Sequence, residues 1–223
     1  FAARRVAAAI LCSPLTYSSI AALVADAIIP RMPDSPLRFA TPATWTDAVL
    51  ADFDSFLLDH ATAEKKASGM AISMLSHYPD RTELVTAMAD LAIEELTHYR
   101  EVVKWIHQRG LTITPDQKDP YVVAFRESIR QGREVYLLDR LLTASIIEAR
   151  GAERFALVAA ALEPGPLKKF YQSIARSEER HFELFLDLAR KYLAPDMIEQ
   201  RWDELLDIEA ALVESLPIRA ALH

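Results

Sequence analysis

Apolar residues recur every three or four positions along most of the chain, and this is the spacing of one face of an α-helix. Prolines and glycines interrupt the pattern at a few points and mark where helices end. The pattern predicts five helices, at about Trp45–His77, Thr82–Gln108, Tyr121–Leu162 with a bend at Gly132, Leu167–Tyr192 and Pro195–Glu214.

The first four predicted helices are long and are joined in pairs by short connections, which favours an all-α four-helix bundle built from two antiparallel hairpins. The fifth is amphipathic and is expected to pack on the outside of the bundle. Residues 1–43 are punctuated by prolines and are interpreted as an N-terminal helical leader. The bundle domain is therefore predicted to span residues 44–223, with Thr44 as the N-cap of its first helix.

Within the predicted leader, the apolar run Val6–Cys12 follows two arginines, a pattern that also suits a signal or transit peptide. A helix docked on the surface is favoured instead, because Pro14 and Pro30 interrupt the pattern. No apolar run reaches the roughly 18 residues that a membrane span needs. We therefore expect a cytoplasmic protein that does not act at a membrane.

The composition narrows the kinds of site that the chain can build. Its 223 residues are 51% hydrophobic and 26% charged, enough for one large domain with a buried core. The single cysteine, Cys12, excludes an internal disulfide framework and a cysteine-rich metal site. The net charge of -7 argues weakly against a general nucleic-acid binder. That argument weakens further if several acids bind divalent cations, which return positive charge.

One pattern of acids and histidines occurs twice. In the first hairpin Glu64 precedes the motif Glu95-Leu-Thr-His98, and in the second Glu148 precedes Glu178-Glu-Arg-His181 at almost the same separation. In both cases the turn between the helices lies near the middle, so an antiparallel hairpin brings the two glutamates to a similar height. Residues three apart share a helix face, so each Glu-x-x-His motif can point inward.

Four carboxylates and two imidazoles are an oxygen and nitrogen donor set that suits iron or manganese. The arrangement is typical of ferritin-like carboxylate proteins with two metal ions. Glu94 could also share a face with His98, and Glu95 is preferred because its position matches that of Glu178. A solvated helix face is the simpler alternative, but both motifs lie on apolar faces, where unpaired carboxylates are costly.

The stretch from Leu137 to Phe155, Leu-Leu-Asp-Arg-Leu-Leu-Thr-Ala-Ser-Ile-Ile-Glu-Ala-Arg-Gly-Ala-Glu-Arg-Phe, resembles the third-helix signature of the MiaE family. Asp59-His60 before Glu64-Lys-Lys-Ala, Glu94-Glu95-Leu with His98, and Phe170-Tyr171 with Ser177-Glu178 and His181 are similar to its other helices. The resemblance implies a ferritin-like di-iron monooxygenase that hydroxylates the isopentenyl group of 2-methylthio-isopentenyl-adenosine beside the tRNA anticodon. It also implies that dioxygen and an external electron donor, of unknown identity, take part.

Two departures from the family pattern concern the pocket. The family usually has Ser-Cys where this chain has Gly151-Ala152, and a histidine where it has Thr97. Neither change removes a predicted ligand, and Ala152 is expected to widen the pocket. Four apolar residues are expected to exclude water and shape the prenyl pocket: Leu141, Ala144, Phe155 and Phe185.

Further residues are candidates for supporting roles. Tyr171 and His60 could hydrogen-bond to the metal ligands, although a plain core tyrosine is the alternative. Four arginines would form a stripe on a continuous helix, and such a stripe could bind RNA phosphates or merely pair with neighbouring acids: Arg126, Arg130, Arg133 and Arg140.

Three other functions remain open at this point. The same ligands could serve a ferritin-like oxidase or iron-handling protein without an RNA substrate. A vestigial metal site in an RNA-binding protein, or a manganese or mixed-metal oxidase acting on a lipid-like substrate, would also fit the residues.

Overall fold

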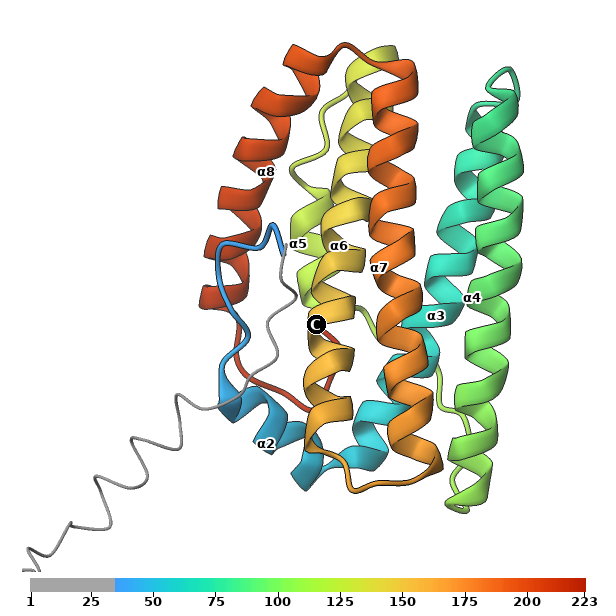
Figure 1. Cartoon of the computed structure of the whole chain (residues 1–223), viewed down its shortest axis with the longest axis vertical. Coiled ribbons are helices and arrows are strands. Elements are labelled where there is room, and N and C mark those ends of the chain that lie inside the picture. Colours follow the sequence, from blue (N-terminus) through green and yellow to red (C-terminus); the bar gives the residue numbers. More distant parts are fainter. Residues whose placement is uncertain (1–34) are drawn as a thin grey trace, which may run out of the picture. The chain divides into compact units, whose positions relative to one another are not determined.

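The structure is a computed structural model that describes residues 35–223, and these residues form seven α-helices and no strand (Figure 1). The predicted all-α fold is confirmed. Most of the predicted leader, with the run Val6–Cys12, lies outside the described residues, and the domain boundary at residue 44 stays a prediction. The helices are α2 Ala43–Ala51, α3 Phe53–His77, α4 Thr82–Gln108, α5 Pro120–Arg126, α6 Arg133–Ala161, α7 Pro166–Tyr192 and α8 Pro195–Ser215.

Four long helices form the bundle. α3 packs along α4 and α6 packs along α7, each pair as an antiparallel hairpin, and α4 also contacts α7 (Figure 1). The predicted bounds of α4, α7 and α8 agree with the structure to within one residue. α4 is followed by Gly110 at a φ of 74°, a conformation that glycine adopts without strain.

Two of the predicted helices are interrupted in the structure. The first breaks at Asp52, which leaves the helical conformation and accepts a hydrogen bond from the backbone N–H of Ser55 at the start of α3 (3.2 Å). The third was predicted to bend at Gly132, but it is broken over residues 127–132: α5 ends at Arg126, Gly132 has a φ of 128°, and α6 begins only at Arg133. The predicted N-cap was also wrong: Pro42 precedes α2, and Thr44 lies inside it.

The fifth predicted helix, α8, packs on α5, α6 and α7 at the edge of the bundle (Figure 1). A fully buried ion pair joins it to α6: the Arg150 guanidinium donates to Glu209 Oε1 and Oε2 at 2.8 and 3.0 Å. Arg150 also donates to Glu153, to Thr41 and to the carbonyl oxygen of Phe39. This network fixes the segment before α2 against the bundle.

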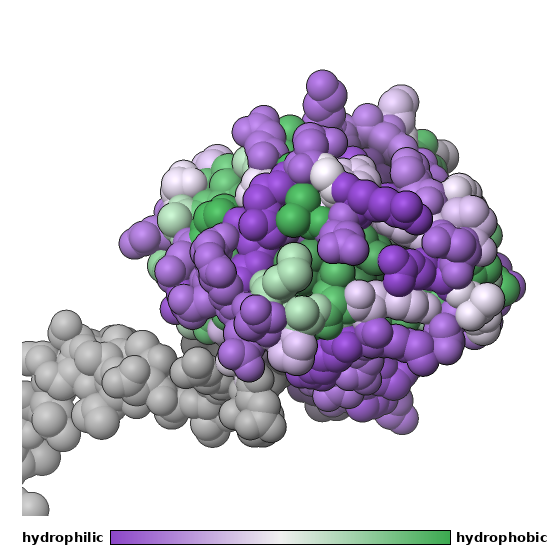
Figure 2. Space-filling model, turned by 90° about the horizontal axis from the view of Figure 1, so that it is seen from above, coloured by the Kyte–Doolittle hydropathy of each residue, from purple (hydrophilic) through white to green (hydrophobic). Residues whose placement is uncertain are grey.

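Viewed end-on, the molecule has hydrophilic residues around its rim and apolar residues between the helix ends (Figure 2). This distribution is expected when amphipathic helices turn their apolar faces inward. None of the helices in residues 35–223 has both the length and the apolar character needed to cross a membrane.

Candidate metal centre

The six predicted ligands meet inside the bundle. Their ligand atoms form two groups, in each of which the atoms lie within 4.8 Å of one another. One group contains Glu64, Glu95, His98 and Glu178, and the other contains Glu95, Glu148, Glu178 and His181. Glu95 and Glu178 belong to both groups, so these two carboxylates are placed to bridge a pair of cations.

Several polar atoms in this cluster have no hydrogen-bond partner among the described residues. They are Glu95 Oε1, Glu178 Oε1 and both ring nitrogens of His181, and none of them makes a hydrogen bond of good geometry, although His181 Nδ1 is 2.9 Å from Glu95 Oε1. Glu95 and His181 are only 1% and 3% exposed. Because buried polar atoms are nearly always hydrogen-bonded, these unsatisfied oxygen and nitrogen atoms fit a site that metal ions complete. Metal ligation by the six residues remains a prediction.

The electrostatics of the cluster are those of acids held together away from water. Burial raises the pKa of Glu64 and Glu95, and burial together with Glu178 raises that of Glu148 well above its ordinary value. Burial alone would lower the pKa of His98, but its contacts with Glu64 and Glu95 outweigh this and raise the value to about 10. Bound cations would neutralise the carboxylates in place of the protonated histidines.

His60 and Tyr171 extend the cluster on the α3 side. His60 is fully buried, and burial lowers its pKa to about 3, so the imidazole is neutral. Its Nε2 lies 2.6 Å from Glu64 Oε1 and its Nδ1 lies 3.3 Å from the Tyr171 hydroxyl. All three groups are satisfied when Tyr171 donates to Nδ1 and the Nε2–H donates to Glu64. The two hydrogen bonds, from Tyr171 to His60 and from His60 to Glu64, hold one Glu64 oxygen in place.

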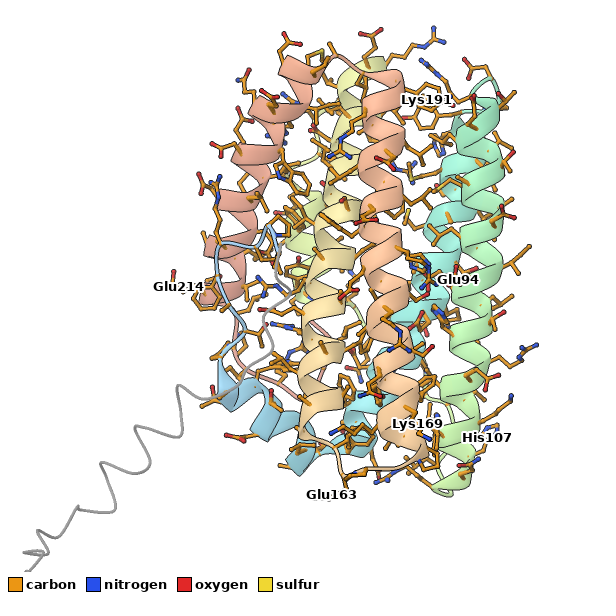
Figure 3. The ribbon with its side chains drawn as sticks, in the orientation of Figure 1. Glu94, His107, Glu163, Lys169, Lys191 and Glu214 are labelled. Carbon is orange, nitrogen blue, oxygen red and sulfur yellow. The ribbon has the colours of Figure 1, made fainter. Side chains whose placement is uncertain are left out.

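Glu94 lies outside the cluster, between α4 and α7 (Figure 3). Its carboxylate is 3.3 Å from His181 Nε2 and 3.8 Å from His98 Nε2, whereas the Nδ1 atoms of both histidines face the buried carboxylates. Ser177 and Arg180 donate to Glu94 from α7. Burial would raise the pKa of Glu94, but the hydrogen bond from Ser177 and the nearby His181 ring lower it. Sequence reasoning had considered Glu94 only as an alternative ligand.

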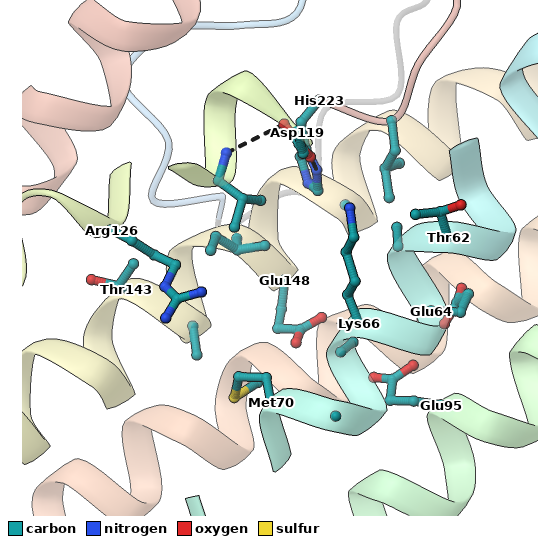
Figure 4. Close-up of a pocket in the computed structure, with 18 of the residues that line it drawn as sticks. Thr62, Glu64, Lys66, Met70, Glu95, Asp119, Arg126, Thr143, Glu148 and His223 are labelled. Atoms are coloured by element: carbon teal, nitrogen blue, oxygen red, sulfur yellow. Dashed lines mark hydrogen bonds and ion pairs between the residues drawn. The ribbon is translucent and has the colours of Figure 1, made fainter. Parts of the chain in front are cut away.

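A cavity of about 720 Å³ opens next to the cluster, and all four carboxylates line it. Figure 4 shows Glu64, Glu95 and Glu148 around this cavity together with Lys66, Met70 and Arg126. Of the residues expected to shape the pocket, Ala144 and Phe155 line it. Leu141 and Phe185 do not, because they are fully buried in the hydrophobic core.

A family model described as tRNA-(MS2IO6A)-hydroxylase (MiaE) matches residues 30–223. The chain belongs to the MiaE family. A tRNA 2-(methylsulfanyl)-N(6)-isopentenyladenosine(37) hydroxylase from Pseudomonas putida is 36% identical over 165 residues, which are 74% of this chain and 80% of that protein. A hydroxylase of the same name from Salmonella typhimurium is 33% identical over 133 residues, 60% of this chain and 48% of that protein.

The fold is also similar to that of a solved structure described as protein 43 with aldehyde deformylating oxygenase activity, from Synechococcus. The two share 32% sequence identity with a TM-score of 0.78, over 84% of this chain and 94% of that chain. The predicted ferritin-like architecture is therefore confirmed for this member of the MiaE family.

Gly151 and Ala152, which stand where the MiaE signature usually has Ser-Cys, differ in their position relative to the cavity. Gly151 lines the cavity, and a Cβ added to it would lie 3.8 Å from the Glu178 side chain, an ordinary contact. Ala152 is fully buried and does not line the cavity. The prediction that Ala152 widens the pocket was wrong, and Gly151 has that effect.

The predicted stripe of four arginines does not exist as a continuous surface, because the helix that would carry it breaks at Gly132. Arg130 lies in the connection and makes a two-point contact with Asp139 at 2.8 and 3.0 Å. Arg133 is exposed and lies 3.8 Å from Asp80. Arg126 and Arg140 line the cavity.

Proposed function

We propose that this chain hydroxylates the isopentenyl group of a prenylated adenosine in tRNA, using two iron ions bound by the six clustered residues. The observation that carries the proposal is that the two ligand groups share Glu95 and Glu178, and that the four carboxylates also line the cavity. A substrate in this cavity would lie beside the metals. Membership of the MiaE family supports tRNA as the substrate.

The reaction inserts one oxygen atom of dioxygen into a C–H bond and releases the other as water, with two electrons and two protons from an external donor. The iron ions would supply the activation of dioxygen. Manganese offers the same preference for oxygen and nitrogen donors, so the choice of iron rests on the chemistry of the reaction. We place the reaction in the cytoplasm, where tRNA is available.

The protein's own residues would orient the metals and the substrate. Glu95 and Glu178 would contact both ions, and Glu64 would be held by the hydrogen bond from His60. The other cavity-lining residues near Glu148 are small or apolar, among them Ala144, Gly151 and Phe155. They would accept a prenyl chain and keep water away from the reacting carbon.

The test is nucleoside mass spectrometry on prenylated tRNA incubated with iron-loaded protein, a reductant and oxygen. We expect the prenylated adenosine to gain one oxygen atom, and we expect no gain with Glu148→Ala. An iron-loaded protein that consumes oxygen without modifying the tRNA would refute the proposal. An aldehyde should be supplied in a parallel reaction, because the similarity to a protein with aldehyde deformylating oxygenase activity makes this class the second candidate substrate.

A further inference from the structure

The cavity extends well beyond the carboxylate cluster along one face of α6. Arg140, Ala144 and Glu148 all line it, at the spacing of four residues that keeps side chains on one helix face, and Thr143 and Ile147 line it beside them. The rise of 1.5 Å per residue separates Arg140 from Glu148 by about 12 Å. A prenyl chain held beside Glu148 would place the sugar of its nucleoside towards Arg140. Arg140 therefore lies where a phosphate attached to such a nucleoside would reach.

Two arginines at this end of the cavity have no acidic partner. Within residues 35–223, neither Arg126 nor Arg140 forms a hydrogen bond or a salt bridge to a carboxylate. Burial lowers the pKa of Arg140, and the nearby charge of Arg126 acts in the same direction. Most arginines in the described chain contact acids, as Arg130 does with Asp139. Two adjacent, unneutralised guanidinium groups in one cavity are an attractive site for an anion.

A second and independent feature of the same region is the Thr143 side chain. Thr143 lines the cavity and is only 2% exposed. Its hydroxyl oxygen has no hydrogen-bond partner among the described residues. An unpaired buried hydroxyl costs free energy unless a ligand or a water satisfies it. It lies one helical turn from Arg140, towards Glu148, where the polar edge of a base would pass.

We propose that Arg126 and Arg140 bind a phosphate that flanks the target nucleoside, and that Thr143 hydrogen-bonds to the base. This inference rests on the proposed function and adds a subsite to it. The phosphate would fix the nucleoside at one end, and the prenyl chain would extend past Thr143 to the carboxylate cluster. Of the four arginines in the predicted stripe, these two would contact RNA within the cavity, while Arg130 and Arg133 would not.

Equilibrium binding tests the subsite without turnover. Metal-loaded protein is titrated under anaerobic conditions with the prenylated nucleoside, its 5′-monophosphate and its 3′-monophosphate. We expect at least one of the monophosphates to bind about tenfold or more tightly than the nucleoside. Arg126→Gln combined with Arg140→Gln should remove this preference and leave binding of the nucleoside unchanged. Arg133→Gln, which removes the same charge outside the cavity, should keep it.

A longer substrate gives a second readout. Binding of an anticodon stem-loop weakens with salt, and each lost phosphate contact reduces the slope of log K against log [salt] by roughly 0.7 to 0.9. Arg126 is exposed, so the single Arg126→Gln variant keeps the test available if Arg140→Gln disturbs folding. Equal wild-type affinity for nucleoside and monophosphates, or an equal loss in Arg133→Gln, would overturn the subsite.

The two proposals fail in different ways. Hydroxylation of tRNA without any phosphate preference would overturn the subsite and leave the proposed function intact. A phosphate preference that depends on Arg126 and Arg140, in a protein that does not modify prenylated tRNA, would support the subsite and overturn the proposed reaction. Replacing Thr143 with valine should weaken binding of the nucleoside and of both monophosphates by the same factor, because it changes only the contact with the base.

Discussion

Replacing Glu148 with glutamine should stabilise the metal-free protein and weaken the metal-loaded one. Glu148 is 6% exposed and shares a ligand group with two other carboxylates, those of Glu95 and Glu178. Burial and the nearby Glu178 raise its pKa well above the ordinary value of 4.5. Glutamine has almost the same size and shape as a protonated glutamate but does not titrate, so the substitution removes the cost of keeping this group uncharged.

The size of the effect follows from that difference in protonation. If the folded, metal-free protein holds Glu148 protonated at pH 7 while the unfolded chain ionises it near its ordinary pKa, the cost is at most about 3 kcal/mol. A raised carboxyl pKa means that the folded state binds more protons. The stability of the wild type should therefore fall as the pH rises above about 4.5, and the advantage of Glu148→Gln should grow up to pH 7.

Urea denaturation of chelator-treated protein between pH 4.5 and pH 7 measures this advantage. In thermal unfolding the full effect would raise the Tm by roughly 6 to 12 °C for a domain of this size. Adding metal should reverse the order, because a ligand at about 1,000 times its Kd stabilises the wild type by about 4.1 kcal/mol, which exceeds the advantage of the variant. A metal-free Glu148→Gln protein that is less stable than the wild type at pH 7 would show that the carboxylate cluster is not strained.

Three further outcomes follow from contacts in the structure. Glu94→Gln should lower metal affinity by about 10 to 100-fold in a cobalt titration, because it removes the negative charge that faces the outer nitrogens of both histidines, whereas Asp90→Asn on the same helix should have no effect. Glu209→Ala leaves Arg150 buried without its main partner and should lower the free energy of unfolding by about 3 to 5 kcal/mol in urea. Gly151→Leu should fill the cavity and abolish hydroxylation while two metal ions still bind, and Gly151→Ala should be tolerated.

The sequence was sufficient to predict the bundle and the clustering of its acids, because both depend on local spacing. Each Glu-x-x-His motif shares a helix face, and the turn near the middle of each hairpin brings Glu64 level with Glu95 and Glu148 level with Glu178. Contacts between segments that are distant along the chain could not be predicted from spacing. The pairing of Arg150 with Glu209 depends on where α8 packs, and no spacing along the chain encodes it.

Spacing alone also could not decide which of two adjacent glutamates, Glu94 or Glu95, points into the cluster. Helical periodicity allowed both Glu94 and Glu95 to accompany His98, and only the rotation of α4 against α7 separates them. That rotation is set by packing across the bundle. It turns Glu95 inward between both ligand groups and leaves Glu94 on the outer edge of the histidines, 38% exposed.

The arginine prediction failed for a different physical reason, and the failure is informative. A helical wheel assumes one continuous helix, but α5 ends at Arg126, and α6 begins only at Arg133 after Gly132 with its positive φ. The break leaves Arg130 in a connection where Asp139 neutralises it, while Arg126 on α5 and Arg140 on α6 reach the same cavity from two different helices. A shared cavity defines a binding site better than a shared helix face does. It is this contact with the cavity, and the lack of a salt bridge to an acid within residues 35–223, that makes two of the four arginines candidates for binding the substrate.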